Sequence, residues 1–156
     1  MSALNDRLMA LLEAGPLPEG EGWGALVRLR DEGGEPLGFA GRLQGGAELR
    51  ATVAEAGRLA LEADARFGAA GREGAIDAIE LYLVREGEQV SEAAPLLPGE
   101  GVHVVGGHRR AVYLSPPGHS PVEVLRGGCI AAGLHPKSWE DEAGPRITRL
   151  TVHRLG

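Results

Sequence analysis

The spacing of apolar residues predicts three helices, two of them in the first half of the chain. From Ser2 to Ala14, leucines recur at helical spacing, Ser2 supplies an N-cap and Gly15-Pro16 ends the run. From Glu48 to about Phe67, mostly small apolar residues form a stripe. A stripe of small residues predicts that this second helix packs closely on a sheet.

The third helix has the strongest local signal in the sequence. Ser120-Pro121-Val122-Glu123 is a capping box with proline at the first helical position, and the helix is expected to run to about Ala132. Gly127 and Gly128 lie inside it, where each costs about 1 kcal/mol relative to alanine. We therefore expect another part of the chain to approach the helix closely at these two glycines.

Alternation of apolar and polar residues predicts the strands. From Trp23 to Arg30, apolar residues alternate with Arg28 and Arg30. The other predicted strands are Leu37 to Leu43, Ile76 to Val84, the two arms of the hairpin VHVV-GGH-RRAVYL, and Ile147 to His153. The polar stretch from Arg85 to Glu100 is expected to be a connector. Hairpins interrupted by helices favour an α+β fold with a mainly antiparallel sheet.

Length and charge limit the function classes. The 156 residues are enough for a single domain with its own core. A net charge of −6 argues against general affinity for nucleic acid or for an anionic membrane. Residues 101–156, however, hold 7 basic and 4 acidic side chains, a local charge of +3. Scattered solvated arginines are the favoured interpretation, with a small anionic ligand or an acidic partner as the alternative. The arginines are Arg109, Arg110, Arg126, Arg146, Arg149 and Arg154.

Cys129 is the single cysteine, which excludes an intrachain disulfide and a cysteine-rich metal site.

The sequence shows no secretory signal and no membrane-spanning segment. The N-terminal segment lacks a basic region followed by an apolar core, and no window approaches the run of about 18 apolar residues that spans a bilayer. The expectation is a cytoplasmic protein that does not contact membranes.

Standard catalytic and cofactor motifs are absent. The chain has no dinucleotide fingerprint, Walker loop, nucleophile elbow, zinc-protease motif or EF-hand, so no cofactor or metal is expected. His103 and His108 lie on the predicted hairpin, which leaves open a two-histidine site across it. Ordinary surface or hydrogen-bonded histidines are the favoured interpretation.

Three smaller arrangements of polar residues have simpler explanations than catalysis. Cys129 with His119 or His135 would form a thiolate–imidazole pair, but a buried cysteine acting as a small hydrophobe is the commoner case. Asp77 and Glu80 are explained by a solvated strand end rather than by acid–base chemistry. Asp64 and Arg66, near the end of the second helix, are explained by an ion pair or by bracing of a loop.

Several short strings in the same order resemble the AMMECR1 domain family. They cover residues 25–139 and are ALVRL with EPLGFAG, LRATVAEAGRLALEADARF, IDAIELYLV, LLPGEGVHVV with RRAVYLSP, and AGLHPKSW. The second string ends in an Asp-x-Arg-Phe box, here Asp64, Arg66 and Phe67. The resemblance implies an antiparallel sheet flanked by helices, with a smaller subdomain that forms a cleft near the family's LRGCIG strand. The family has no settled reaction, and its members look like partners of Memo-type and radical-SAM proteins in bacterial and archaeal operons.

The chain departs from the family at polar positions. Where the family has Arg-Gly-Cys-Ile-Gly, this chain has Leu37, Gly38, Phe39, Ala40 and Gly41. The family's His-Gly falls on Glu100-Gly101, its Leu-Pro-Gln on Leu114-Ser115-Pro116, and its lysine before Ala-Gly-Leu on Ala131. The glycines are kept while the guanidinium and the thiol are lost. A site that needed that thiolate or that anion clamp could not work here.

The main hypothesis is a binding or accessory module whose cleft takes a protein partner, such as a Memo-like or radical-SAM protein, or a small anionic ligand. The residues expected to line the cleft are Gly38, Phe39, Gly41, Asp64, Arg66, Phe67, His103, Arg109, Arg110 and Tyr113. The alternative is an enzyme or enzyme component working with such a partner on a small substrate. That alternative requires His103, His108 or His119 to converge with Arg109 or Asp64. A homodimer through a sheet edge or the alanine-rich helix is compatible with both hypotheses.

Overall fold

The computed structural model describes residues 3–46, 48–63, 75–90, 96–97 and 99–155. The chain divides into two compact units. Unit 1 comprises Met1–Arg85 with His153–Gly156, and unit 2 comprises Glu86–Val152. None of the described helices is long and apolar enough to cross a membrane.

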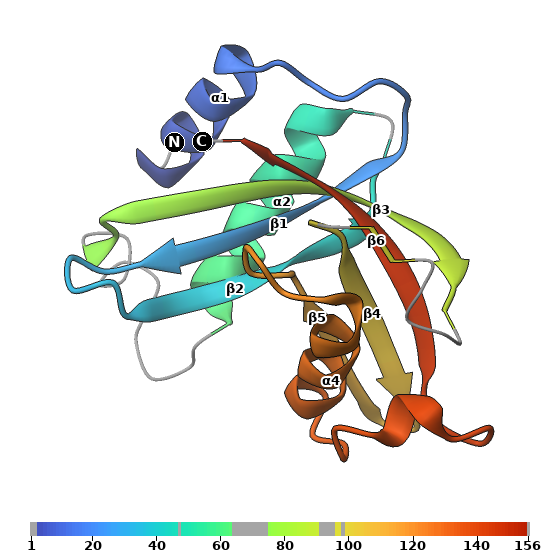
Figure 1. Cartoon of the computed structure of the whole chain (residues 1–156). Helices are drawn as coiled ribbons and strands as arrows, with labels where there is room; N and C mark the ends of the chain where they lie inside the picture. The colour runs from blue at the N-terminus through green and yellow to red at the C-terminus, as the bar shows by residue number, and fades with distance from the viewer. Residues whose placement is uncertain (1–2, 47, 64–74, 91–95, 98, 156) are drawn as a thin grey trace. The chain divides into compact units, whose positions relative to one another are not determined.

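The described residues of unit 1 include the helices α1 and α2, the antiparallel strands β1, β2 and most of β3, and the end of β6. β1 lies between β2 and β3 and is antiparallel to both. The bounds are α1 Ala3–Ala14, β1 Trp23–Arg30, β2 Pro36–Gln44, α2 Leu49–Glu62 and β3 Ala78–Gln89. The predicted helices and strands of this region are present, but the bounds of two differ by more than one residue: α2 ends at Glu62, before the predicted end near Phe67, and β3 begins at Ala78 rather than Ile76. Figure 1 shows α2 crossing the strands of unit 1.

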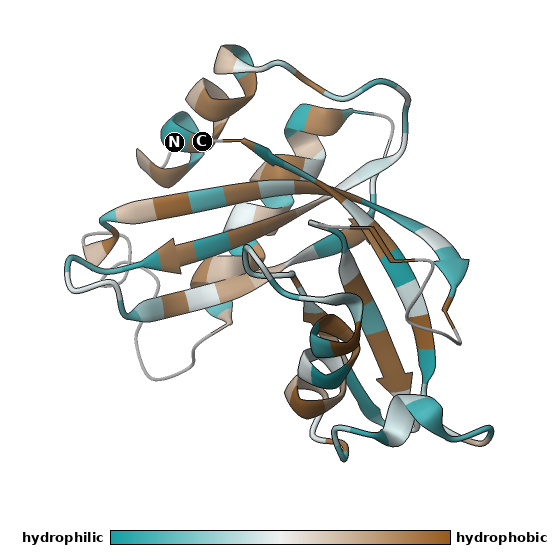
Figure 2. Cartoon of the chain, viewed as in Figure 1, coloured by the Kyte–Doolittle hydropathy of each residue, from teal (hydrophilic) through white to brown (hydrophobic). Residues whose placement is uncertain are grey.

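The core of unit 1 lies between α1, α2 and one face of its strands. Alternate residues of β1 point into it, and the small residues of α2 allow the helix to lie close to the sheet, as predicted. Figure 2 shows the corresponding bands of hydrophobic and hydrophilic residues along β1 and β3. The fully buried residues are Ala25, Val27 and Leu29 of β1, Leu81 and Leu83 of β3, and Val53, Ala56 and Ala60 of α2.

Two glycines of β2 lie where neighbouring backbone leaves no room for a side chain. A Cβ atom at Gly38 would lie 2.0 Å from the carbonyl oxygen of Ala60 in α2. A Cβ atom at Gly41 would lie 1.9 Å from the carbonyl oxygen of Ala25 in β1. Both positions therefore require glycine because of packing, whatever else they do.

The described residues of unit 2 include the end of β3, β4, β5, most of β6 and the helix α4. β4 lies between β5 and β6 and is antiparallel to both. The bounds are β4 Gly101–Gly106, β5 Arg109–Tyr113, α4 Pro121–Ala131, a 3-10 turn at Ser138–Glu140 and β6 Arg146–Leu155. Figure 1 shows α4 against β4 and β5. Antiparallel strands covered by helices in both units confirm the α+β fold class.

The signals that predicted α4 are confirmed in atomic detail. The Ser120 hydroxyl accepts from the Glu123 backbone N–H at 3.3 Å, and the Glu123 carboxylate accepts from the Ser120 N–H at 3.1 Å. A Cβ atom at Gly127 would lie 2.4 Å from Cζ of Tyr113, and one at Gly128 would lie 2.7 Å from a methyl of Val102. The close approach expected at the two glycines is therefore made by β4 and β5.

The predicted connector from Arg85 to Glu100 is wrong in its first part. β3 continues to Gln89, five residues beyond the expected end at Val84. The added residues show no apolar alternation, so the side-chain pattern gives no strand signal there. The strand is longer because its backbone pairs with β6. Just beyond the strand, the N–H of Val90 still donates to the carbonyl of Ile147 at 2.7 Å.

Candidate functional site

The residues predicted to line one cleft are distributed over both units. Asp64, Arg66 and Phe67 lie outside the described residues. In unit 1, Gly38, Phe39 and Gly41 lie on β2. In unit 2, His103 lies on β4, and Arg109, Arg110 and Tyr113 lie on β5. The common cleft itself stays a prediction.

In unit 2, two of the predicted site residues have local partners that account for their positions. Nδ1 of His103 lies 2.8 Å from a carboxylate oxygen of Glu86. The guanidinium of Arg109 donates a hydrogen bond to the carbonyl of Gly133, just after α4. Arg110 is exposed. Arg109 therefore braces the end of α4 in this structure.

His103 and His108 do not form a two-histidine site across the hairpin. The strand register places His103 opposite Val112, whereas His108 lies in the turn between β4 and β5. His119 lies before α4, with its Nδ1 3.5 Å from the Tyr113 hydroxyl. Among the described residues there is no group of three or more side chains able to hold a metal ion. The interpretation as ordinary hydrogen-bonded histidines is confirmed for His103.

Cys129 is buried in the core of unit 2, as predicted. Its exposed fraction is 0%, and burial raises the pKa of its thiol. We expect the native protein to resist alkylation by iodoacetamide at pH 8, because the reactive thiolate is disfavoured and shielded. Mass spectrometry should show full labelling only after unfolding in urea. Rapid labelling of the folded chain would contradict a buried thiol and would favour a thiolate–imidazole pair of Cys129 with His119 or His135.

A second group of side chains gathers on the face of the unit 1 strands opposite α2. Because side chains alternate along a strand, Arg28 and Arg30 lie on the face opposite Ala25, Val27 and Leu29. The register places Arg28 directly beside Phe39 of β2 and Glu80 of β3. We call this group the arginine cluster; its members are Arg28, Arg30, Phe39, Glu80, Tyr82 and Arg154.

Glu80 is the centre of the arginine cluster. Its carboxylate lies 2.8 Å from Nε of Arg30, 3.6 Å from the Arg28 guanidinium and 4.0 Å from that of Arg154. It also accepts a hydrogen bond from the Tyr82 hydroxyl. The side chain of Glu80 is 13% exposed. Three guanidinium groups thus share one carboxylate, which leaves the cluster with an excess of positive charge.

The surroundings of Glu80 shift two pKa values. Burial raises the pKa of Glu80, but the hydrogen bonds from Tyr82 and Arg30 and the charges of Arg28 and Arg30 outweigh burial and hold the pKa below its ordinary value. Burial, together with the hydrogen bond to Glu80 and the charge of Glu80, raises the pKa of Tyr82. Near neutral pH, the carboxylate is therefore ionised and the phenol keeps its proton.

Arg28 differs from the other arginines of the cluster in its contacts. Its Cζ lies 4.4 Å from the centroid of the Phe39 ring and 5.9 Å from that of Tyr82. Its ion pair with Glu80, at 3.6 Å, is too long for a hydrogen bond, and Arg28 donates none to any described residue. Aromatic contacts therefore hold a guanidinium whose N–H groups have no acceptor among the described residues.

The sequence interpretation of Glu80 as part of a solvated strand end is wrong, although it is correct for the exposed Asp77. Alternation alone places Arg28 and Arg30 on the polar side of one strand, and Glu80 and Tyr82 on the polar side of another. The alternation in the sequence therefore predicts the face on which each of these residues lies, but it does not predict that the two strands are neighbours.

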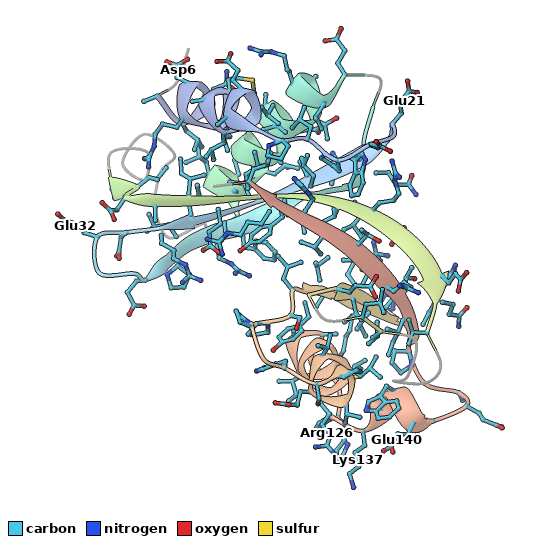
Figure 3. The ribbon with its side chains drawn as sticks, turned by 45° about the horizontal axis from the view of Figure 1, so that its top comes forward. Asp6, Glu21, Glu32, Arg126, Lys137 and Glu140 are labelled. Atoms are coloured by element: carbon cyan, nitrogen blue, oxygen red, sulfur yellow. The ribbon has the colours of Figure 1, made fainter. Side chains whose placement is uncertain are left out.

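Among the arginines of residues 101–156, Arg126 is exposed and projects outward from α4 in Figure 3, which fits the solvated interpretation. That interpretation is wrong for Arg149, which pairs with the buried Glu100 at 2.8 Å.

Comparisons with known proteins support the fold. No protein-family model matches the chain, and a search of curated proteins found no match. The structure is similar to the crystal structure of an uncharacterized protein, PH0010, from Pyrococcus horikoshii, with a TM-score of 0.68 and 19% sequence identity. The similarity covers 97% of this chain and 86% of that one. At this level of identity, the similarity shows a shared fold.

Proposed function

We propose that this chain is a binding or accessory module of the AMMECR1 type, and that its arginine cluster recognises an anionic group. The family assignment draws on the ordered strings over residues 25–139 and on the α+β fold shared with an archaeal protein. The observation that carries the function is the group of three guanidinium groups around a single carboxylate.

The position of the arginine cluster agrees with the resemblance. Phe39 stands where the family has its cysteine, and its ring contacts the guanidinium of Arg28. Leu37, which stands where the family has its arginine, is buried in the core of unit 1. The guanidinium groups beside this strand come instead from β1 and β6. The anion clamp lost at Leu37 is thus replaced by side chains of neighbouring strands.

The chemistry of the arginine cluster favours binding over catalysis. Arginine keeps its proton, so guanidinium groups hold an anion but do not exchange protons with it. The two groups that could exchange protons, Glu80 and Tyr82, are hydrogen-bonded to each other, and each has a pKa shifted away from neutrality. An enzyme working beside a Memo-like or radical-SAM partner stays the alternative prediction.

A titration with small anions tests the proposed function. The intact chain, labelled with 15N, is titrated with acetate, benzoate and inorganic phosphate at low ionic strength while the arginine Nε–Hε signals are recorded. At least one anion should shift the Arg28 signal saturably, and in Arg28→Ala the same anion should no longer shift the backbone amide signals of β1 and β2. Arg58, an exposed arginine of α2 paired with Glu62 at 3.0 Å, provides the matched control, since Arg58→Ala should leave binding unchanged. The proposal is wrong if no anion shifts the Arg28 signal saturably.

A further inference from the structure

We infer that the arginine cluster takes a monoanionic carboxylate joined to a flat apolar group, and that Arg28 is the residue that binds the carboxylate. The inference rests on the proposed function, because it names the ligand class of the same site. It also assigns Arg30 the role of a positioning residue that holds Glu80 in place.

Hydrogen bonding distinguishes Arg28 from Arg30. Arg30 donates from Nε to Glu80 at 2.8 Å and from Nη1 to the carbonyl of Gly34 at 3.1 Å. Its fork of donors is therefore already engaged. Arg28 has five N–H donors and no acceptor among the described residues, while its side chain is still 25% exposed. A ligand that approaches the cluster finds its free donors on Arg28.

The shape of a guanidinium favours a carboxylate as the anion. The two parallel N–H groups of an arginine fork match the two oxygens of a carboxylate in one plane. Phe39 and Tyr82 contact the Arg28 guanidinium from neighbouring strands, which restricts its rotation. The fork is therefore arranged before a ligand arrives, so less side-chain entropy is lost on binding.

The number of free donors favours a ligand with a single carboxylate at this position. Glu80 is 3.6 Å from Arg28 and remains bonded to Arg30 and Tyr82, so it does not leave when a ligand binds. Attraction by the guanidinium groups and repulsion by Glu80 both grow with the ligand's charge, so charge alone does not decide the class of anion. Arg30 is already engaged by Glu80 and Gly34, so the free donors are those of the single planar fork of Arg28, which matches two coplanar oxygens. One guanidinium with free donors thus favours a carboxylate over a phosphate dianion.

An apolar group is needed because the ion pair alone is weak. An exposed guanidinium–carboxylate pair changes a binding equilibrium by about fivefold at most. The Phe39 ring beside Arg28 is only partly buried, so it offers apolar surface next to the free donors. Contact of a flat group with such a ring adds on the order of tenfold. Measurable affinity therefore requires both parts in one ligand.

Five probes separate the contributions of charge, shape and apolar contact. Benzoate represents a free aromatic carboxylate, N-acetylphenylalanine the C-terminal residue of a peptide, and acetate the carboxylate alone. Phenyl phosphate carries a dianion on the same ring, and benzyl alcohol carries no charge. In the Nε–Hε titration of the intact chain, we expect benzoate or N-acetylphenylalanine to bind Arg28 about tenfold more tightly than acetate. Phenyl phosphate should bind more weakly than benzoate, and benzyl alcohol should leave the Arg28 signal unshifted.

Matched variants assign the two parts of the ligand to residues. Phe39→Leu should weaken benzoate binding about tenfold and leave acetate binding unchanged, because only the ring contact is lost. Arg28→Lys keeps the charge but removes the fork, so it should weaken binding of both carboxylates, as read from the backbone amide signals of β1 and β2. Arg42→Lys alters an exposed arginine that pairs with Glu55 at 3.1 Å, and it should change neither affinity. Circular dichroism confirms that each variant is folded.

Two results would overturn the inference while the proposed function stands. One is acetate binding as tightly as both aromatic carboxylates, which would remove the apolar group from the ligand. The other is phenyl phosphate binding more tightly than benzoate, which would make the site one for dianions. If no anion shifts the Nε–Hε signal of Arg28, both the proposed function and the inference are wrong.

Discussion

Replacing Gly38 by alanine is expected to lower the free energy of unfolding by about 3 kcal/mol. The added Cβ would lie 2.0 Å from the carbonyl oxygen of Ala60, and backbone of a helix cannot move aside as the end of a flexible side chain can. α2 would have to shift away from β2, and Ala56 and Ala60, which are fully buried, would lose their packing. Urea unfolding followed by circular dichroism measures the effect.

A second glycine of unit 1 supplies the control for this experiment. A Cβ atom at Gly46 would meet nothing within 4 Å, and Gly46 has no positive φ. Gly46→Ala should therefore leave the stability unchanged or raise it by up to about 1 kcal/mol, because alanine restricts the unfolded chain. If Gly38→Ala proved as stable as Gly46→Ala, the close approach of α2 to β2 would be wrong.

The elements of this fold that could be predicted are those with local signals. β1 has the bounds predicted for it, because alternation marks both of its ends. The capping box located the start of α4, and two costly glycines within one helix indicated a close neighbour there. Each of these signals needs only residues adjacent in the sequence. The end of β3 lacks such a signal, since backbone pairing with β6 rather than a side-chain pattern forms it.

The arginine cluster could be predicted only in part, because its contacts join distant parts of the chain. Arg30 and Glu80 are 50 positions apart, and their contact depends on β1 and β3 being neighbours in one register. The resemblance predicted a site near the strand of Phe39, and the Phe39 ring does contact Arg28. It gave no information on Glu80, which looks like any other acidic residue at a strand end until the register is known.

Replacing Glu80 by glutamine is expected to lower the free energy of unfolding at pH 7 by about 2 kcal/mol. The carboxylate is the shared acceptor of Arg30 and Tyr82 and the nearest negative charge to Arg28. Glutamine has a similar shape but no charge, so the guanidinium groups would repel one another without compensation. Urea unfolding of both proteins at a series of pH values measures the difference.

The difference in unfolding free energy between the wild type and Glu80→Gln should shrink as the pH falls. The pKa of Glu80 in the folded protein is below its ordinary value of 4.5, so ionised Glu80 stabilises the fold. This contribution is fully present above about pH 4.5 and is lost as the pH falls through the pKa of the folded state. The wild-type protein should therefore lose stability in acid more steeply than Glu80→Gln, and the two should converge at low pH.

Glu55 is the matched control for Glu80, because it also lies near two arginines. Its carboxylate is 3.1 Å from Arg42 and 3.7 Å from Arg58, but its side chain is 40% exposed against 13% for Glu80. Exposed ion pairs are screened by solvent, so Glu55→Gln should cost less than about 1 kcal/mol. Equal effects of the two substitutions, or a Glu80 effect that stays constant down to pH 3, would show that the charge at Glu80 does not organise the arginine cluster.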